Sequence, residues 1–316
     1  MAKKKVKKGS RKKVFKTVKP VQSKTDKTKD TEWKLVKRKV NDTVRRIRNL
    51  EIQGAREISV ASMSVLKEVA QVKGFGPEFA LAAEKFIGAR PTGISLYNCM
   101  KPIKEKKSIK SIDKVLKYLV KAQEWLSYNG SKLIKNNVVI MTHCHSSSVL
   151  NVLKKAKGDH RDFRVIVSET RPKLQGMKTA KELIGMGIPI YYIVDSAGPF
   201  LVSKCDMVIV GADAIRADGV LNKIGTYPIA LAAMEASIPF YVAASKDKLD
   251  YDCVSEIEDR PDREIGNPDE LEASGGEIEN PAFDLTPWKL ITGVITESGV
   301  LGQREIRMLL DGNFKI

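Results

Sequence analysis

Hydrophobic positions recur every three or four residues through the first part of the chain, a spacing typical of amphipathic helices. The first such stretch, after Thr31, carries its apolar positions at Leu35, Val36, Val40, Val44, Ile47 and Leu50. The same spacing predicts helices over residues 59–72, 77–86 and 111–129, with a loop at residues 88–93 that contains Gly and Pro. We therefore expect residues 31–130 to form a helical N-terminal domain.

The pattern changes at Asn136, where short β-branched runs begin to alternate with helical stretches. The candidate strands are residues 138–142, 164–168, 188–194, 207–210 and 240–244, and the helices between them are residues 147–157, 179–186, 198–204 and 227–237. This alternation predicts an α/β domain over residues 131–316, built on a Rossmann-like, doubly wound and mostly parallel sheet. Ligands of such sheets bind beyond the carboxyl ends of the strands, so site residues are expected just after each strand.

The last part of the chain is less regular. The acidic residues 256–279 show no period, and their Pro and Gly residues predict a long surface excursion. A last strand is expected within residues 290–296 and a closing helix over residues 303–310.

The net charge of +17 is concentrated at the N-terminus. Residues 1–40 hold 17 Lys or Arg and 3 Asp or Glu, a net of +14, which leaves +3 for all later residues. A run of this kind repels itself and has little apolar surface to bury, so we expect residues 1–30 to be a disordered basic tail. Such a tail suits contacts with nucleic acid or other polyanions, although a charge run is more often a solvated segment.

Several classes of protein are disfavoured by what the sequence lacks. No apolar run approaches the roughly 18 residues of a membrane span, and the N-terminal lysines precede no signal-peptide core, so we expect a cytoplasmic protein without membrane contact. Its four cysteines show no CxxC spacing, which predicts neither a zinc site nor disulfides. GxGxxG and GxxxxGK[ST] motifs are also missing, which argues against a dinucleotide enzyme and a P-loop nucleotidase.

The first predicted strand runs into Thr142-His143-Cys144-His145 and then three serines, Ser146, Ser147 and Ser148, at a helix start. Hydroxyl groups and free backbone N–H groups at a helix start suit a phosphate, and ordinary helix capping is an equal alternative. The thiol of Cys144, beside that helix start and two imidazoles, could have a lowered pKa and be reactive. A lone cysteine is more often inert packing.

The fourth predicted strand runs into Asp213, and Asn222 and Lys223 follow shortly before another helix start. A carboxyl group directly after an apolar strand is costly to desolvate, so Asp213 could be held protonated and serve as an acid. The alternative is that it caps a turn. Lys223 is placed to reach an anionic ligand.

Taken together, these segments resemble the family that contains ribose-1,5-bisphosphate isomerases, methylthioribose-1-phosphate isomerases and the regulatory subunits of translation initiation factor 2B. The resemblance covers roughly residues 31–316. It rests on the ordered segments Ala89-Arg90-Pro91-Thr92, Thr142-His143-Cys144-His145-Ser146, Glu169-Thr170-Arg171-Pro172 with Gln175-Gly176, Gly211-Ala212-Asp213, Asn222-Lys223-Ile224-Gly225-Thr226 and Asn280-Pro281-Ala282-Phe283-Asp284.

The resemblance implies a sugar-phosphate isomerase in which Cys144 is the base and Asp213 the acid, because the isomerases of the family keep this pair. It also implies catalysis without metal or cofactor and a homo-oligomer, a dimer or an assembly of dimers. The implied substrate-binding residues are Gln53, Gly54, Ala55, Arg56, Arg90, Ser146, Ser147, Ser148, Asn222, Lys223 and Lys248.

Among the family members, the isomerase that converts ribose 1,5-bisphosphate to ribulose 1,5-bisphosphate fits best. Methylthioribose-phosphate isomerases typically show Arg-Gly-Ala-Pro and Cys-Asn-Thr-Gly, where this chain has Gln53-Gly54-Ala55-Arg56 and Cys144-His145-Ser146-Ser147. Gln53 departs from the arginine of related isomerases, which puts substrate affinity and identity in question. The alternatives are an isomerase of another sugar 1-phosphate, such as methylthioribose 1-phosphate, and a non-catalytic subunit like those of initiation factor 2B.

Overall fold

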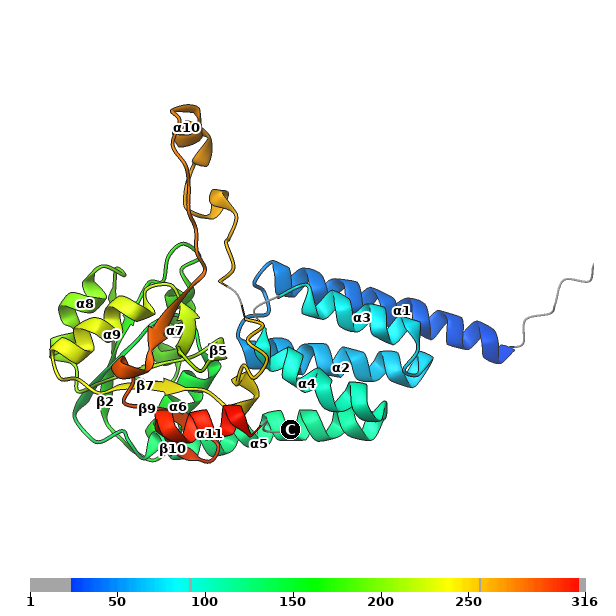
Figure 1. The fold of residues 1–316 in the computed structure, drawn as a ribbon, viewed down its shortest axis with the longest axis horizontal. Coiled ribbons are helices and arrows are strands. Elements are labelled where there is room, and N and C mark those ends of the chain that lie inside the picture. The colour runs from blue at the N-terminus through cyan, green and yellow to red at the C-terminus, as the bar shows by residue number, and fades with distance from the viewer. Residues whose placement is uncertain (1–23, 91–92, 256, 313–316) are drawn as a thin grey trace, which may run out of the picture.

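The computed structural model describes residues 24–90, 93–255 and 257–312. Its first half is a bundle of helices that packs beside an α/β domain (Figure 1). The helices are α1 (Lys24–Arg48), α2 (Ala55–Lys73), α3 (Pro77–Ile87), α4 (Ile94–Lys106) and α5 (Ile109–Ser131). Their apolar faces form one core that includes the predicted positions Val36, Val40, Val44 and Ile47.

Two features of this half differ from the prediction. Helix α1 begins at Lys24, so residues 24–30 of the expected disordered tail are helical, and residues 1–23 lie outside the described residues. Helix α4 was not predicted, because its sequence contains Pro102 and a broken apolar period.

The second half is the predicted α/β domain. Its main sheet has the order β10-β9-β7-β4-β1-β2-β3, in which every neighbouring pair is parallel except β9 and β10. The strands are β1 (Val138–Thr142), β2 (Phe163–Ser168), β3 (Ile190–Ile193), β4 (Met207–Val210), β7 (Phe240–Ala243), β9 (Gly293–Thr296) and β10 (Gly299–Leu301). The predicted fold class and the mostly parallel sheet are confirmed.

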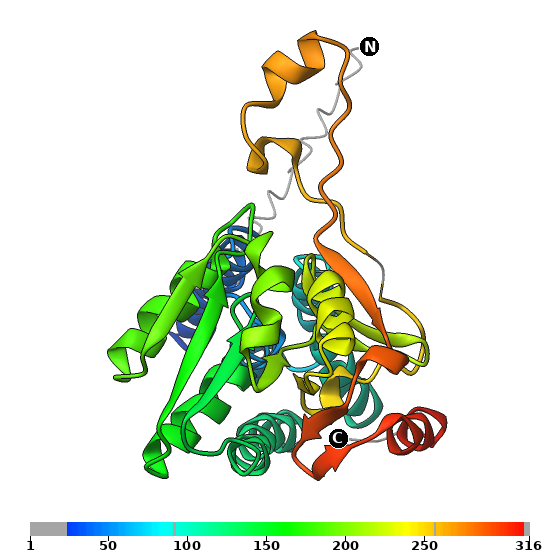
Figure 2. The ribbon, with the colours of Figure 1, turned by 90° about the vertical axis from the view of Figure 1, so that its left-hand side faces the viewer.

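Helices cover both faces of this sheet (Figure 2). One face, which includes Ile140 and Val165, packs against α5, α6 and α7, and the other, which includes Met141 and Ile166, packs against α8, α9 and α11. Neighbouring strand residues thus point to opposite cores, as expected of a doubly wound sheet. These helices are α6 (Ser147–Gly158), α7 (Gln175–Gly185), α8 (Ala197–Leu201), α9 (Thr226–Glu235) and α11 (Gln303–Asp311).

A small antiparallel sheet was not predicted. It pairs β5 (Ala214–Ile215), β6 (Gly219–Lys223) and β8 (Phe283–Pro287) in the order β5-β6-β8. Between η2 (Lys246–Lys248) and β8 the chain leaves the body as an arm, which carries η3 (Asp262–Glu264) and α10 (Pro268–Ala273) and projects away from both halves (Figure 1). This arm is the predicted surface excursion. Short turns η1 (Val202–Lys204) and η4 (Trp288–Leu290) complete the described elements.

None of the helices within the described residues combines the length and the apolar character needed to cross a membrane.

Candidate active site

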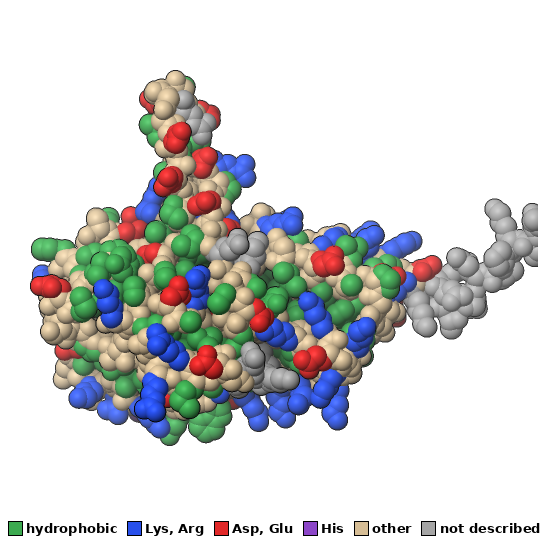
Figure 3. Space-filling model, viewed as in Figure 1, with side chains coloured by type: hydrophobic (Ala, Val, Ile, Leu, Met, Phe, Trp, Pro, Cys, Tyr) green, Lys and Arg blue, Asp and Glu red, His purple; other side chains and the backbone are tan. Residues whose placement is uncertain are grey.

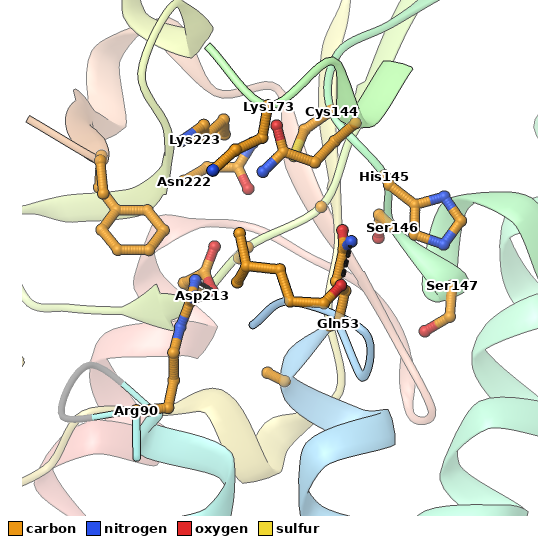
Figure 4. Close-up of a pocket in the computed structure, with 18 of the residues that line it drawn as sticks. Gln53, Arg90, Cys144, His145, Ser146, Ser147, Lys173, Asp213, Asn222 and Lys223 are labelled. Atoms are coloured by element: carbon orange, nitrogen blue, oxygen red, sulfur yellow. Dashed lines mark hydrogen bonds and ion pairs between the residues drawn. The ribbon is translucent and has the colours of Figure 1, made fainter. Parts of the chain in front are cut away.

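A pocket lies where the carboxyl ends of the sheet meet the helical half (Figure 4). Together with the open solvent at its mouth, the pocket has about 770 Å³ of empty space. All of the predicted site residues except Arg56 and Ser148 line it. The full lining is Leu50, Gln53, Gly54, Ala55, Arg90, Cys144, His145, Ser146, Ser147, Lys173, Gln175, Gly211, Ala212, Asp213, Asn222, Lys223, Lys248, Arg260, Glu264, Ala282 and Phe283.

Cys144 occupies a tight turn between β1 and α6. Its φ of 69° is in the left-handed region, which is uncommon for a residue with a Cβ. The turn is held by two hydrogen bonds: the Cys144 N–H donates to Thr170 Oγ1 at 2.9 Å, and the Thr179 hydroxyl donates to the Cys144 carbonyl at 2.9 Å. Thr170 is itself fixed, because its N–H donates to Asp195 Oδ1 at 2.7 Å. The thiol is therefore presented by a rigid backbone.

The electrostatics of Cys144 differ from the prediction. Desolvation by the surrounding protein raises the pKa of the thiol to about 11, while the nearby Lys223 ammonium acts in the opposite direction. The adjacent imidazoles do not favour a positive charge, since burial lowers the pKa of His143, and burial followed by the charge of Lys178 lowers the pKa of His145 to about 4. The expected lowered pKa of Cys144 is therefore wrong, because desolvation outweighs the charge of Lys223.

Asp213 follows β4 and faces the same pocket from a more open position. Its N–H donates to Leu221 O at 2.9 Å, which ties the residue to β6. Its carboxylate keeps 24% exposure, and Oδ1 lies 3.8 Å from Arg90 Nη2. Arg90 reaches this position from the loop after α3 (Figure 4), with its guanidinium 5.3 Å from the centre of the Phe283 ring.

The serines at the start of α6 have three different environments. Ser146 caps the helix, since its Oγ accepts from Val149 N–H at 3.4 Å, and it also lines the pocket. Ser147 lines the pocket and donates to Glu57 Oε2 at 2.9 Å, which joins the two halves of the molecule. Ser148 does not line the pocket, because it is buried on the other side of the helix, where it donates to Gln123 Oε1 at 3.4 Å.

The ends of β1 and β4 approach each other closely at Gly211. A Cβ built on Gly211 would lie 2.6 Å from Ser146 Oγ, which is closer than side-chain atoms come. Glycine is therefore needed at this position for the Cys144 and Asp213 strand ends to share one pocket.

The helical half contributes the loop between α1 and α2. Gly54 in this loop has a φ of 86°, which favours glycine, and Gln53 lines the pocket while its Nε2 donates to Leu50 O at 2.5 Å. Arg56, by contrast, turns away: its Nε donates to Leu119 O at 3.3 Å and its Nη1 pairs with Glu57 at 3.2 Å. Arg56, which was predicted to bind substrate, does not line this pocket, because helix α2 directs it toward α5.

Two lysines and Asn222 bring polar groups to the inner wall. Lys223 is 7% exposed and Lys248 is 4% exposed, and burial lowers the pKa of Lys223. Asn222 Nδ2 donates to Thr226 Oγ1 at 2.9 Å. Asp284 holds the following turn, since its Oδ2 accepts from the N–H groups of Gly225 and Tyr227 at 2.8 and 3.1 Å.

Five further side chains line the pocket although the sequence gave them no site role: Lys173, Gln175, Arg260, Glu264 and Phe283. Gln175 and Phe283 do lie inside segments that carry the resemblance, and that was a usable signal. Arg260 and Glu264 lie in the arm, whose sequence has no period and so gave no hint of where it folds.

Across the described residues, no group of three or more His, Cys, Asp or Glu side chains is arranged to hold a metal ion. The polar groups that line the pocket are mainly cations and amide or hydroxyl donors, which suit phosphates and sugar hydroxyls.

Comparison with known proteins finds close relatives over most of the chain. A ribose 1,5-bisphosphate isomerase of Archaeoglobus fulgidus is 39% identical over 280 residues, which are 83% of this chain and 89% of the relative. One of Methanocaldococcus jannaschii, with the same name, is 37% identical over 83% of this chain and 91% of its own.

A solved structure described as the translation initiation factor eIF-2B of Pyrococcus horikoshii OT3 superposes with a TM-score of 0.74 at 31% identity, covering 84% of this chain and 98% of that one. The sequence model of the initiation factor 2 subunit family matches residues 51–303. This match and the identities of the relatives show that the chain belongs to the initiation factor 2 subunit family. The proteins that it resembles include ribose 1,5-bisphosphate isomerases.

Proposed function

We propose that this protein converts ribose 1,5-bisphosphate to ribulose 1,5-bisphosphate by acid–base catalysis. The observation that carries the proposal is that Cys144 and Asp213 line one pocket together with Arg90, Lys223 and Lys248. A proton acceptor and a proton donor thus lie beside cations for phosphate. Relatives named for this activity support the choice of substrate.

The residue types match the chemistry that this substrate requires. A sugar phosphorylated at C1 cannot open its ring by itself, so the ring oxygen has to be protonated while the C2 proton is removed. We assign the first task to Asp213 and the second to Cys144. The C2 proton moves to the sulfur, the bond between C1 and the ring oxygen breaks, and an enediol forms. The enediol then gains the sulfur-bound proton at C1 and gives its C2 hydroxyl proton to the Asp213 carboxylate, which yields the ketose and regenerates the thiolate and the carboxylic acid.

The surroundings of Cys144 support its role as a base that reacts only with substrate. Desolvation raises the pKa of the thiol, and the Lys223 ammonium is the largest influence that lowers it. A base must lose its proton before it acts, so we assign to Lys223 the role of supporting the thiolate as well as that of contacting phosphate.

Gln175 supplies a further contact for the sugar. Its Oε1 is buried and accepts no hydrogen bond from the described residues, and the residue lines the pocket at the start of α7. An unpaired buried acceptor is costly. A sugar hydroxyl that donates to Gln175 Oε1 would remove this cost on binding.

The test is turnover of ribose 1,5-bisphosphate by the purified full chain, followed by NMR of the ketose product, in parallel with methylthioribose 1-phosphate. We expect ribulose 1,5-bisphosphate to accumulate and the second sugar to react at least about tenfold more slowly. Faster reaction of methylthioribose 1-phosphate would assign the pocket to that sugar. No turnover of either would contradict the proposal and favour a non-catalytic, factor-like role.

We also propose that the chain forms a homo-oligomer through exposed apolar side chains of β3, α8 and α9 and of the turn after β3. The surface comprises Tyr191, Val194, Phe200, Tyr227 and Met234, of which Phe200 is 77% exposed. Figure 3 shows hydrophobic side chains gathered at left, over the end of the molecule where α8 and α9 lie. Large exposed apolar patches mark interaction sites. Sedimentation should give at least a dimer, and Phe200→Glu should shift it toward monomer.

The basic tail is proposed to bind nucleic acid or another polyanion separately from catalysis. Residues 1–30 hold the lysine-rich run, and counterion release would make its binding fall steeply with salt. Titration of nucleic acid at several salt concentrations should show this slope for the full chain and little binding after deletion of residues 1–30. Binding that survives the deletion would move the nucleic-acid site to the folded part.

We further propose a cytoplasmic location. Cys99, Cys144, Cys205 and Cys253 are all free thiols, as expected in a reducing compartment. Cell fractionation with immunodetection tests this, and recovery in a secreted or membrane fraction would contradict it.

A further inference from the structure

A continuous row of opposite charges crosses the mouth of the pocket. Each member lies within 4.0 Å of the next. The row begins at Asp213 inside the pocket and ends at Lys173 in the loop after β2, and its order is Asp213, Arg90, Glu258, Arg260, Glu264 and Lys173.

The middle of this row belongs to the root of the arm, which is firmly attached. Arg260 N–H donates to Asn280 O at 2.9 Å, and Ala282 N–H donates to Glu258 O at 2.8 Å, so the two strands of the root pair with each other. Ile224 N–H then donates to Ala282 O at 3.0 Å, which fixes the root beside Lys223. The side chains of the arm root are therefore held at the pocket even though the arm itself projects away.

Arg260 donates hydrogen bonds to two carboxylates, and its paired contact with Glu264 has the bidentate geometry with which arginine also binds a phosphate. Its Nη2 and Nε contact the two oxygens of Glu264 at 2.6 and 3.2 Å, and its Nη1 contacts Glu258 at 2.9 Å. Lys173 Nζ lies 3.3 Å from the same Glu264 carboxylate, which is only 7% exposed. A guanidinium and an ammonium thus converge on one anion of the size and shape that a phosphate presents.

Other contacts in the row are loose. Arg90 lies 3.8 Å from Asp213 and 4.0 Å from Glu258, distances beyond a hydrogen bond, and Glu258 Oε2 is buried with no hydrogen-bond partner among the described residues. The row holds equal numbers of cations and carboxylates, three of each, but the contacts of Arg90 leave some of its N–H donors without a hydrogen bond to these carboxylates. An incoming anion can therefore replace a carboxylate without leaving a cation unpaired.

We propose that Arg260 and Lys173 bind one of the two phosphates of the substrate, and that Glu264 occupies this phosphate site when the pocket is empty. This rests on the proposed function, in which two phosphates have to be held in one pocket. Lys223 and Lys248, on the inner wall, remain for the other phosphate. The arm root then determines specificity for a bisphosphate, because a sugar with a single phosphate has no group to displace Glu264.

The first experiment uses inorganic phosphate as the probe, with binding measured by the shift in melting temperature. Glu264→Gln removes the competing charge and should tighten phosphate binding about three- to tenfold, whereas Arg260→Met should weaken it about tenfold or more. Arg260→Lys keeps the positive charge but loses the two parallel N–H donors of the guanidinium, so its affinity for phosphate should lie between those of wild type and Arg260→Met. A purely structural Arg260–Glu264 pair predicts no gain of affinity in Glu264→Gln, and that result would overturn the proposal.

The second experiment removes one phosphate at a time from the ligand. Ribulose 1,5-bisphosphate, ribulose 1-phosphate and ribulose 5-phosphate are compared as ligands of wild type, Lys173→Met and Arg260→Met. Both variants should lose about 10- to 100-fold in affinity for the bisphosphate and for one monophosphate, with no change for the other. Equal losses for all three ligands would show a general disturbance of the pocket and would contradict the assignment.

Arg216→Met is the matched control. Arg216 pairs with Asp218 at 3.0 Å and donates to Ser255 O at 3.3 Å, so it also contacts the start of the arm, but it does not line the pocket. Its removal should leave phosphate affinity unchanged, and an equal effect would attribute the result to arm placement. Turnover by the wild-type protein is measured separately. If the protein turns over substrate but the variants do not change phosphate affinity, only the proposed phosphate site is rejected. If the variants change phosphate affinity but the protein has no turnover, only the proposed reaction is rejected.

Discussion

The ends of β1 and β4 lie side by side in the sheet, yet they present their reactive groups in opposite ways. Cys144 stands on a left-handed turn braced by Thr170 and Thr179, and the protein around its thiol raises the pKa to about 11. Asp213 keeps 24% exposure and has Arg90 at 3.8 Å as a charged neighbour. Both residues are half-buried, so the contrast lies in the rigid turn and raised thiol pKa of Cys144 and in the charged neighbour of Asp213.

This difference suits a reaction that needs both protonation states at once. A thiol with a raised pKa is protected from side reactions, and its activation depends on a neighbouring cation. A phosphate that engages Arg90 would take that partner from Asp213.

Removal of either group should have the largest effect. Cys144→Ser and Asp213→Asn are each expected to reduce kcat by at least about 100-fold with the fold intact, because acid–base groups contribute about 10²–10⁴ in rate. Turnover assays with a thermal melt of each variant measure this, and Cys253→Ser, at an exposed cysteine outside the pocket, is the control. If either variant kept more than about a tenth of wild-type kcat, its assigned role would be wrong.

The next effect concerns the shielding of Cys144. Because only the thiolate reacts, alkylation by iodoacetamide in a Cys253→Ser background should rise about tenfold per pH unit and reach no plateau below about pH 10, given the pKa of about 11. Lys223→Met removes the cation that lowers this pKa, so the rate at pH 8 should fall about tenfold. Ribulose 1,5-bisphosphate should protect the thiol. A plateau near neutral pH would show that Cys144 is not shielded, and unprotected labelling at Cys99 would point away from the pocket.

A smaller effect is expected where the two strand ends touch. Gly211→Ala places a methyl group against Ser146 Oγ and forces the two ends apart, at a cost of about 2 kcal/mol in the free energy of unfolding. Because it changes the separation of acid and base, kcat should fall more than KM rises. Gly185→Ala, at a glycine with open space around it, is the control. Unchanged stability and kcat would mean that the two ends are not held in contact.

The smallest effect should come from the support of the Cys144 turn. Thr170→Val keeps the shape of the side chain but removes the acceptor for the Cys144 N–H, which should cost about 1 kcal/mol in urea unfolding. Thr170→Ser keeps the hydroxyl and should restore most of the loss. If Val and Ser behaved alike, the hydrogen bond would not contribute to the rigidity of this turn.

Much of the site followed from the strand-end rule. Cys144, Asp213 and Lys223 are far apart in sequence, but the alternating pattern placed the first two after parallel strands, and such ends meet at one edge. Predictions that came from the resemblance were less specific where the direction of a side chain depends on a helix. Arg56 and Ser148 lie next to residues that line the pocket, yet the turn of α2 and of α6 directs them elsewhere. A resemblance by motif identifies a segment near the site but does not predict the direction in which each of its side chains points.

By itself, the sequence determined the helical half, the mostly parallel sheet and the neighbourhood of Cys144 and Asp213, because hydrophobic periodicity is local and strand ends converge by topology. Only the tertiary structure decided the pKa of the thiol, since desolvation depends on everything packed around it and outweighed the nearby Lys223 ammonium. It also decided the charged row at the pocket mouth. Lys173 and Glu264 lie 3.3 Å apart although they are distant along the chain, and an aperiodic arm gives no pattern from which such a contact can be predicted.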